Sequence, residues 1–308
     1  MIWFFWDGGI SPSRLKIMQD CVNSTIYFND EEVVILSNSL NQDDFKCEVR
    51  KWDASIFEGT PIPISLYEKL YKNTSPREKS DLIRLALLYK FGGSYIDTDD
   101  LGIRKMSGKK NIVCRSYDPH TAWYNKIKDD QCITGTRREI KGYDHIPTFP
   151  RNDCWQNFEP KTNFLKDLLT DKRVLEGEKP IFICDDFSWQ SLTLEYLKKH
   201  PEINYSLTLL YLYESHVAAS SVWDMGAHGG EMHDLYKRLP DITLYPHGKY
   251  LCTEKTALEF YEKVINLYPD VSHLWLHDKD MNPDWLKSDY KEKELISTWI
   301  LKYVREKI

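Results

Sequence analysis

Residues 75–100, SPREKSDLIRLALLYKFGGSYIDTDD, decide the fold of this chain. The stretch opens with three residues typical of a helix start: Ser75 as the N-cap, Pro76 at the first helical position, and Glu78 as the partner of Ser75 in a capping box. Two glycines, Gly92 and Gly93, follow the last turn and end the helix. The pattern therefore predicts a helix from Pro76 to Phe91.

This helix is apolar at nearly every position from Leu82 to Tyr89, with Arg84 as the exception. A segment of this kind packs inside an α/β layer rather than lying on the surface. Residues 94–96 then form a short strand that delivers the acidic run 97–100. In an open α/β sheet, ligands bind at the carboxyl edge of the strands, so the acidic run marks a candidate site.

Asp97 and Asp99 are alternate residues and share a face, so both carboxylates can point at one cation. Hard oxygen ligands suit Mg²⁺ or Mn²⁺, and a site with few protein ligands keeps positions open for substrate phosphates. The spacing therefore favours a metal-bound diphosphate. The alternative is an acidic turn with no ligand, because the D-x-D pattern is common by chance.

The start of the chain predicts a β-α-β unit that opens a mostly parallel sheet. Its parts are a strand at 2–6, a helix that begins at Ser11-Pro12 and ends near Asn29, and a second strand at 32–36. No G-x-G-x-x-G motif accompanies this unit, which argues against a dinucleotide-binding fold. The fold class that follows is α/β, with a mostly parallel mixed sheet flanked by helices.

The rest of the chain continues as α/β without a linker or an internal repeat. Residues 104–160 are polar with little periodicity, and we expect long loops over the functional edge of the sheet. Beyond them the pattern predicts a strand at 181–184, helices at 188–199 and 256–268, and a loop at 226–230. One domain covering residues 1–308 is the simplest organisation.

Composition excludes several classes of protein. The chain has 308 residues, 42% of them hydrophobic, which is enough for a sizeable core. Its formal charge of −6 argues against a protein that neutralises nucleic-acid phosphates. The seven cysteines form no C-x-x-C, which indicates neither a disulfide framework nor a zinc cage and favours the reducing cytoplasm. No apolar run is long enough for a transmembrane segment, so we expect a soluble protein.

Asp81 and Arg84 lie three residues apart on one face of the predicted helix, in a segment otherwise built for burial. Buried charges need partners. One interpretation is that these two residues pair with each other or with a loop. The other is that they line the same cleft as Asp97 and hold polar groups of a ligand, such as sugar hydroxyls.

Here the sequence resembles a known family. Ser80-Asp81-Leu82-Ile83-Arg84, followed by Gly92-Gly93-x-Tyr95-Ile96-Asp97-x-Asp99, is similar to the sugar-nucleotide signature of the D-x-D retaining glycosyltransferases. That family includes capsular polysaccharide synthesis enzymes, initiating mannosyltransferases and glucosylating clostridial toxins. The opening strand, with Phe5 and Trp6, also looks like the first strand of the family.

The resemblance implies a GT-A fold, a nucleotide-diphosphate sugar donor and transfer with retention at the anomeric carbon. It further implies that residues 1–103 bind the donor, that residues 104–308 form the acceptor side, and that the acceptor is a hydroxyl of a glycan or another molecule. Mn²⁺ or Mg²⁺ would be the cofactor and UDP the first choice of nucleotide, with polysaccharide biosynthesis as the context.

The family roles transfer to this chain residue by residue. Trp6 would stack on the base, Asp81 and Arg84 would hold donor hydroxyls, and Ser80 would touch the nucleoside. Asp97 would contact the ribose and sugar, and Asp99 would bind the metal. Asp100 departs from the commonest pattern, so the carboxylate that takes the metal stays open among the run. The donor-binding set is Phe5, Trp6, Ser80, Asp81, Arg84, Tyr95, Asp97 and Trp285, and the catalytic pair is Asp97 and Asp99.

A late segment offers a third metal ligand. His273, Trp275 and His277 alternate along a predicted strand and share a face. The two histidines would stand roughly 13 Å apart, too far for one metal to take both. The segment, with Trp285 nearby, is similar to the late histidine segment of related retaining transferases, which makes His273 the expected ligand and His277 the alternative. A histidine hydrogen-bonded under the sheet is the competing interpretation.

Two other functions compete with a transferase. Residues 95–101 also resemble the nucleophile motif of haloacid dehalogenase phosphatases, which would leave the preceding Asp81/Arg84 helix unexplained. The ten tryptophans are compatible with a non-catalytic glycan-binding module. No dedicated general base stands out, because solvation explains the acidic residues Glu159, Asp185 and Asp186 equally well.

Overall fold

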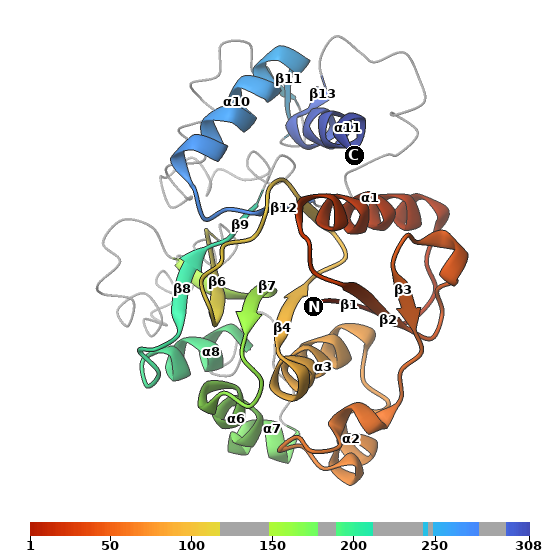
Figure 1. Cartoon of the computed structure of the whole chain (residues 1–308), viewed down its shortest axis with the longest axis vertical. Coiled ribbons are helices and arrows are strands. Elements are labelled where there is room, and N and C mark those ends of the chain that lie inside the picture. Colours follow the sequence, from red (N-terminus) through yellow and green to blue (C-terminus); the bar gives the residue numbers. More distant parts are fainter. Residues whose placement is uncertain (118–147, 178–188, 212–242, 246–248, 277–293) are drawn as a thin grey trace.

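The computed structural model describes residues 1–117, 148–177, 189–211, 243–245, 249–276 and 294–308. Its centre is a seven-stranded mixed sheet in the order β3-β2-β1-β4-β7-β6-β8 (Figure 1). The strands are β1 (Ile2–Trp6), β2 (Val33–Ser37), β3 (Glu48–Arg50), β4 (Gly93–Ile96), β6 (Ile112–Tyr117), β7 (Thr148–Phe158) and β8 (Asn204–Leu207).

Parallel pairing dominates this sheet. β1 lies between β2 and β4 and is parallel to both, β3 is parallel to β2, and β8 is parallel to β6. Only β7 runs against its neighbours β4 and β6 within the described sheet. The predicted α/β class with a mostly parallel mixed sheet is therefore confirmed.

Helices cover both faces of the sheet (Figure 1). α1 (Pro12–Phe28) lies on one face, and α3 (Pro76–Phe91), α6 (Asn163–Thr170) and α8 (Trp189–Leu197) cover the other. Two shorter helices, α2 (Ile64–Leu70) and α7 (Lys172–Glu176), and two 3-10 turns, Gln42–Asp44 and Ala54–Phe57, complete this half. The predicted β-α-β unit at the start of the chain is confirmed.

α3 forms as its sequence predicts. The Ser75 hydroxyl accepts from the Glu78 N–H while the Glu78 carboxylate accepts from the Ser75 N–H, which completes the capping box. The helix ends at Gly92, and the chain enters β4 at Gly93 with a φ of 90°. A Cβ at Gly93 would lie 2.3 Å from the carbonyl oxygen of Met1, so only glycine fits where β4 begins beside β1.

Two smaller sheets lie beyond the main sheet. One has the order β5-β12-β9, from β5 (Asp100–Gly102), β12 (His273–Trp275) and β9 (Leu209–Tyr211), and the other joins β10 (Thr243–Tyr245), β11 (Lys249–Cys252) and β13 (Glu294–Leu295). Two amphipathic helices, α10 (Glu254–Leu267) and α11 (Ile296–Lys307), pack on them and form a second apolar cluster. In Figure 1 these helices form the upper part of the molecule, next to α1.

The prediction of long loops over residues 104–160 is wrong for the described part of that range. β6 and β7 are strands of the main sheet, and β7 fills the place beside β4. The reason is that buried polar side chains interrupt the apolar pattern: Asp153 and Gln156, on either side of Cys154 and Trp155 in the sequence, lie inside the fold. Alternation of apolar and polar residues, the usual signal of a strand, is lost there.

The later predictions fall partly within the described residues. The helix expected at 188–199 is α8, and the one expected at 256–268 is α10. The strand at 181–184 and the loop at 226–230 lie outside the described residues. No helix in the described ranges is long and apolar enough to cross a membrane.

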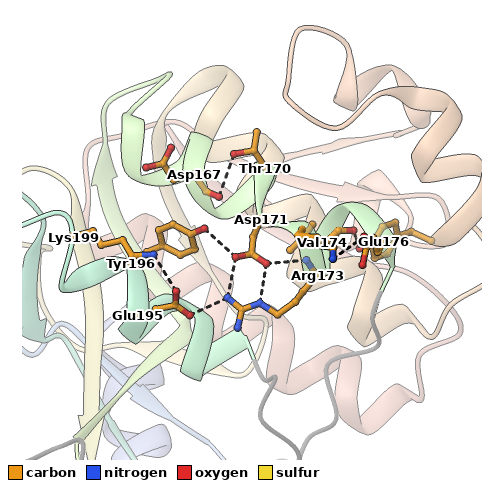
Figure 2. Close-up of polar contacts among 11 residues, drawn as sticks. Asp167, Thr170, Asp171, Arg173, Val174, Glu176, Glu195, Tyr196 and Lys199 are labelled. Atoms are coloured by element: carbon orange, nitrogen blue, oxygen red, sulfur yellow. Dashed lines mark hydrogen bonds and ion pairs between the residues drawn. The ribbon is translucent and has the colours of Figure 1, made fainter.

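A charged network holds α6, α7 and α8 together below the sheet (Figure 2). Asp171 caps α7 and binds the Arg173 guanidinium through both carboxylate oxygens, at 2.8 and 2.9 Å. Arg173 also reaches Glu195 of α8, and the Tyr196 hydroxyl donates to Asp171 at 2.9 Å. The Arg173 contact lowers the pKa of Asp171 to about 2. These charges satisfy one another, so the network stabilises the helical layer.

Candidate active site

The parallel pairing of β1 and β4 brings two predicted site segments to one edge of the sheet. Trp3 lies beside Tyr95 in the register, so both strands end close together, β1 at Trp6 and β4 at Ile96, directly before Asp97. The strands lie next to each other at the centre of the sheet. Their shared carboxyl edge is the place where α/β sheets bind ligands.

The three carboxylates of the acidic run differ in accessibility. Asp97 and Asp99 are half-buried, whereas Asp100 is fully buried and begins β5. A turn in which the Asp100 N–H donates to the Asp97 carbonyl at 3.2 Å separates the two strands. The exposed members of the run are therefore the two that the D-x-D spacing selects.

Arg84 binds the carboxylate of Asp97 directly. Its Nη2 lies 3.2 Å from Asp97 Oδ1 and 3.4 Å from Asp81 Oδ1, and the Arg84 side chain is only 4% exposed. Burial by itself lowers the pKa of Arg84, but the carboxylates of Asp97 and Asp81 outweigh it and raise the pKa. The first interpretation, that Asp81 and Arg84 pair with each other, is confirmed, and Arg84 also contacts Asp97. The second, that they hold polar groups of a ligand, stays a prediction.

Tyr95 and Ser80 both contact Arg84. The Tyr95 ring lies under the Arg84 guanidinium at 4.6 Å, and its hydroxyl hydrogen-bonds Ser80 Oγ at 2.8 Å. Tyr95 is fully buried, and burial raises the pKa of its phenol. Arg84 Nη2 donates to the same Ser80 oxygen at 3.3 Å. These contacts restrict the position of Arg84, and therefore also that of the Asp97 carboxylate to which Arg84 binds.

Trp6 ends β1 as a half-buried ring, while Phe5 before it is a core residue at 5% exposure. The Trp6 indole donates to the Gly8 carbonyl at 3.0 Å, which fixes the plane of the ring. The guanidinium of Arg14, from the first turn of α1, lies 4.8 Å from the ring centre. Sequence patterns did not single out Arg14, because its proximity to Trp6 comes from the turn between β1 and α1.

A residue from the far end of the chain also reaches the acidic run. The Trp275 indole, at the end of β12, donates to Asp99 Oδ2 at 3.1 Å. The next N–H, of Leu276, donates to the Asp99 carbonyl at 2.9 Å. The sequence placed Trp275 near the predicted histidines, but its contact with Asp99 depends on the pairing of β12 with β5.

His273 is buried on the same strand. Its side chain is 0% exposed, and burial lowers the pKa of the imidazole to about 3. Nδ1 lies 2.8 Å from Ser272 Oγ, and Nε2 lies 3.4 Å from Thr25 Oγ1. Among the described residues, no three His, Cys, Asp or Glu side chains come together as a metal site, so the structure does not gather His273 with Asp97 and Asp99.

Five other residues that the sequence analysis considered do not join this edge of the sheet within the described structure. His277 and Trp285 lie outside the described residues, as do Asp185 and Asp186. Glu159 is exposed and pairs with Lys110 at 2.5 Å, in agreement with a solvated surface acid.

The residues at this edge fit a divalent cation in one respect. Two half-buried carboxylates two residues apart offer hard oxygen donors of the kind that Mg²⁺ and Mn²⁺ prefer. The Arg84 contact offsets part of the charge of Asp97. Such a donor set holds a cation weakly by itself and leaves coordination positions for phosphate oxygens.

Comparison with known proteins gives one family match. Residues 16–132 match the family model described as "Glycosyltransferase sugar-binding region containing DXD motif". This range contains most of α1, the whole of α3 and the acidic run. No curated protein matches the chain.

Two solved structures are similar to this chain. The PaToxG glycosyltransferase is 17% identical with a TM-score of 0.45, and the match covers 66% of this chain and 69% of that one. The apo structure of the WbbM bifunctional glycosyltransferase is 10% identical with a TM-score of 0.45, and the match covers 99% of this chain and 51% of that one.

Proposed function

We propose that this glycosyltransferase, whose residues 16–132 match a glycosyltransferase sugar-binding region with a DXD motif, transfers a sugar from a UDP-sugar donor to a hydroxyl of a glycan or another acceptor. The proposal includes a divalent cation, Mn²⁺ or Mg²⁺, and retention at the anomeric carbon. A GT-A fold is the fold type that goes with it. The match favours this function over a haloacid dehalogenase phosphatase and a glycan-binding module, because it covers the helix and strand that carry Asp81, Arg84 and the D-x-D.

One observation carries the proposal: Arg84, from the helix of the signature, binds Asp97, from its strand, at 3.2 Å. The two halves of the motif are thus a single charged cluster at the edge where β1 also ends. A D-x-D pattern that arose by chance would not be expected to lie both beside a buried arginine and at the end of the first strand.

We assign roles by accessibility. Trp6 offers a ring for the base, and Asp97 and Asp99 offer carboxylates for the donor. Arg84 is too buried to be the main contact of a ligand, so it acts by holding Asp97 and Asp81 in place. Tyr95, Ser80 and Phe5 belong to the support of the site by the same criterion, since Tyr95 and Phe5 are buried and the Ser80 hydroxyl binds Tyr95.

The chemistry then rests on charge. A bound divalent cation supplies neutralisation of the departing diphosphate. Asp97 and Asp99 hold the donor in orientation, which lowers the entropic part of the barrier for attack by the acceptor hydroxyl. Arg84 limits the repulsion between Asp97 and the diphosphate, because it keeps a positive charge 3.2 Å from that carboxylate.

For the third ligand we propose His277 in preference to His273. His273 is buried, and its imidazole is engaged by Ser272 and Thr25. The described chain reaches Asp99 through Trp275 and Leu276, and His277 is the next residue in the sequence. His277→Ala should raise the Mn²⁺ concentration needed for activity, whereas His273→Gln should leave it unchanged.

The proposal also says which part of the chain binds the donor and which part forms the acceptor side. We propose that residues 1–308 act as one domain, with residues 1–103 binding the donor and 104–308 forming the acceptor side. β12 contributes to both, because it belongs to the later part and contacts Asp99.

Calorimetry with a UDP-sugar tests the function. Binding should require Mn²⁺, since Asp97, Asp99 and the diphosphate otherwise face one another as like charges. Asp99→Asn should weaken binding in Mn²⁺, and Glu159→Gln, which changes an exposed acid outside the site, should not. Equal affinity in Mn²⁺ and in excess chelator would remove the metal from the proposal.

A second comparison separates the sugar from the nucleotide. Asp81 lies on α3 beside Arg84, whereas Trp6 comes from β1. Asp81→Ala should therefore weaken intact UDP-sugar much more than free UDP, by the roughly 1.5 to 3 kcal/mol of a charged hydrogen bond. Trp6→Ala should weaken both ligands alike. Equal losses for both ligands in Asp81→Ala would contradict the assignment of Asp81 to the sugar.

A further inference from the structure

β12 is held against the acidic run by its backbone. It pairs antiparallel with β5, with Trp275 opposite Asp100, and parallel with β9. One step further, the Leu276 N–H donates to the carbonyl of Asp99 at 2.9 Å. The end of β12 thus lies directly beside Asp99, although 176 positions separate Trp275 from it in the sequence.

The side chain of Trp275 adds a second contact to the same residue. Its Nε1–H donates to Asp99 Oδ2 at 3.1 Å, and the ring packs against the main apolar cluster. An indole N–H can only donate, and a carboxylate accepts such a bond more strongly than a neutral oxygen does. A carboxylate has about four acceptor positions, so a bond from Trp275 is compatible with coordination of a cation.

We propose that Trp275 is a positioning residue of the donor site, which fixes the orientation of the Asp99 carboxylate for the cation and the diphosphate. The inference rests on the proposed function, because it takes Asp99 as the metal-binding member of the D-x-D. A ligand carboxylate that is held by an outer donor keeps one orientation, and loss of such a donor weakens metal binding.

The geometry makes this role specific to Trp275. Asp97 is held by Arg84 from α3. The Asp99 carboxylate is held by the side chain of Trp275, and the Asp99 backbone carbonyl by the N–H of Leu276. The two carboxylates are therefore fixed by elements far apart in the sequence, α3 and β12, and docking of β12 becomes a condition for a complete cation site.

The test removes the indole N–H of residue 275 and keeps an aromatic side chain there. Trp275→Phe, and for an unchanged shape the replacement of Trp275 by 3-benzothienylalanine, both delete the donor to Asp99. Trp299→Phe is the matched control, because its indole donates to the Cys252 carbonyl at 2.8 Å in the second cluster, away from the acidic run. The readouts are Mn²⁺ binding without donor, followed by electron paramagnetic resonance, and the Mn²⁺ concentration for half-maximal donor hydrolysis.

Both Trp275 variants should bind Mn²⁺ on the order of ten-fold more weakly than the original protein, and Trp299→Phe should bind it normally. Combined with Asp99→Asn, the Trp275→Phe change should cause no further loss, because its effect passes through Asp99. A merely structural role would lower stability in both backgrounds without this dependence.

The outcomes separate the inference from the function. If the original protein binds Mn²⁺ and Asp99→Asn weakens it, but the benzothienyl variant binds normally, the role of Trp275 is overturned and the proposed function stands. If the original protein binds no Mn²⁺ and hydrolyses donor equally well in chelator, the metal-dependent function is overturned, and the role of Trp275 with it.

Discussion

The buried imidazole of His273 leads to a quantitative prediction about stability at low pH. Its pKa is lowered to about 3 in the folded chain, against about 6.5 in an unfolded chain. The unfolded state therefore binds a proton that the folded state excludes between these two values. The free energy of unfolding must therefore fall as the pH drops below about 6.5. The contribution of His273 to this fall ends near pH 3, where the folded state also takes up the proton.

The size of the effect follows from these two pKa values. Between pH 7 and pH 5, His273 alone should remove about 2 kcal/mol from the free energy of unfolding. In His273→Gln this contribution is absent, so the stability of the variant should depend less on pH by the same about 2 kcal/mol. The Cys154 thiol, 3.8 Å from the imidazole, stays neutral over this range because burial raises its pKa well above the usual value.

Urea unfolding at pH 7, 6 and 5, followed by circular dichroism, measures the difference. Ser272→Ala is the control, since it removes the hydroxyl that lies 2.8 Å from His273 Nδ1 without removing a titrating group. Its stability should be lower at every pH, with the slope of the original protein. If the free energy of unfolding depended on pH equally in the original protein and in His273→Gln, the view that His273 is a neutral core residue would be refuted.

Three further predictions concern other parts of the fold. Asp171→Asn should lower the free energy of unfolding by about 2 kcal/mol at pH 7, because the Arg173 contact lowers the pKa of Asp171 to about 2. The difference in stability between the variant and the original protein should narrow as the pH falls below about 3.8, and urea titrations at pH 7 and pH 3 measure this difference. Gly93→Ala should destabilise by about 2 kcal/mol or more in thermal unfolding, since φ is 90° and the new Cβ would meet the Met1 carbonyl at 2.3 Å, whereas Gly108→Ala, in open space, should be near neutral. Arg14→Ala should weaken UDP and uridine by similar factors in calorimetry if the guanidinium supports the Trp6 ring, and a loss confined to UDP would assign Arg14 to the phosphates instead.

The sequence predicted those parts of the fold that local chemistry controls. The capping box at Ser75, the glycine pair after α3 and the apolar run of β1 each act within a few residues, and each element begins or ends where these signals lie. The same signals placed Asp97 at the end of a buried strand. Local signals therefore located both the helix and the strand of the site.

The sequence did not predict features that depend on contacts between distant segments. β7 was missed because the buried Asp153 and Gln156 break its apolar alternation, and their burial depends on neighbouring elements. The sequence pattern placed Trp275 among the neighbouring histidines, whereas its indole donates to Asp99 because β12 pairs with β5. Alternation along the strand predicted which face His273 lies on, but the burial of that face depends on the elements packed against it.

The most direct test of the central claim is a screen of nucleotide-sugars for hydrolysis with Mn²⁺ and with excess chelator. We predict that a UDP-sugar is hydrolysed in Mn²⁺, that chelator removes the activity, and that Asp99→Asn lowers it while Glu159→Gln does not. Activity that is indifferent to chelator and to Asp99→Asn would contradict the account, as would the trapping of a phosphoaspartate at Asp97.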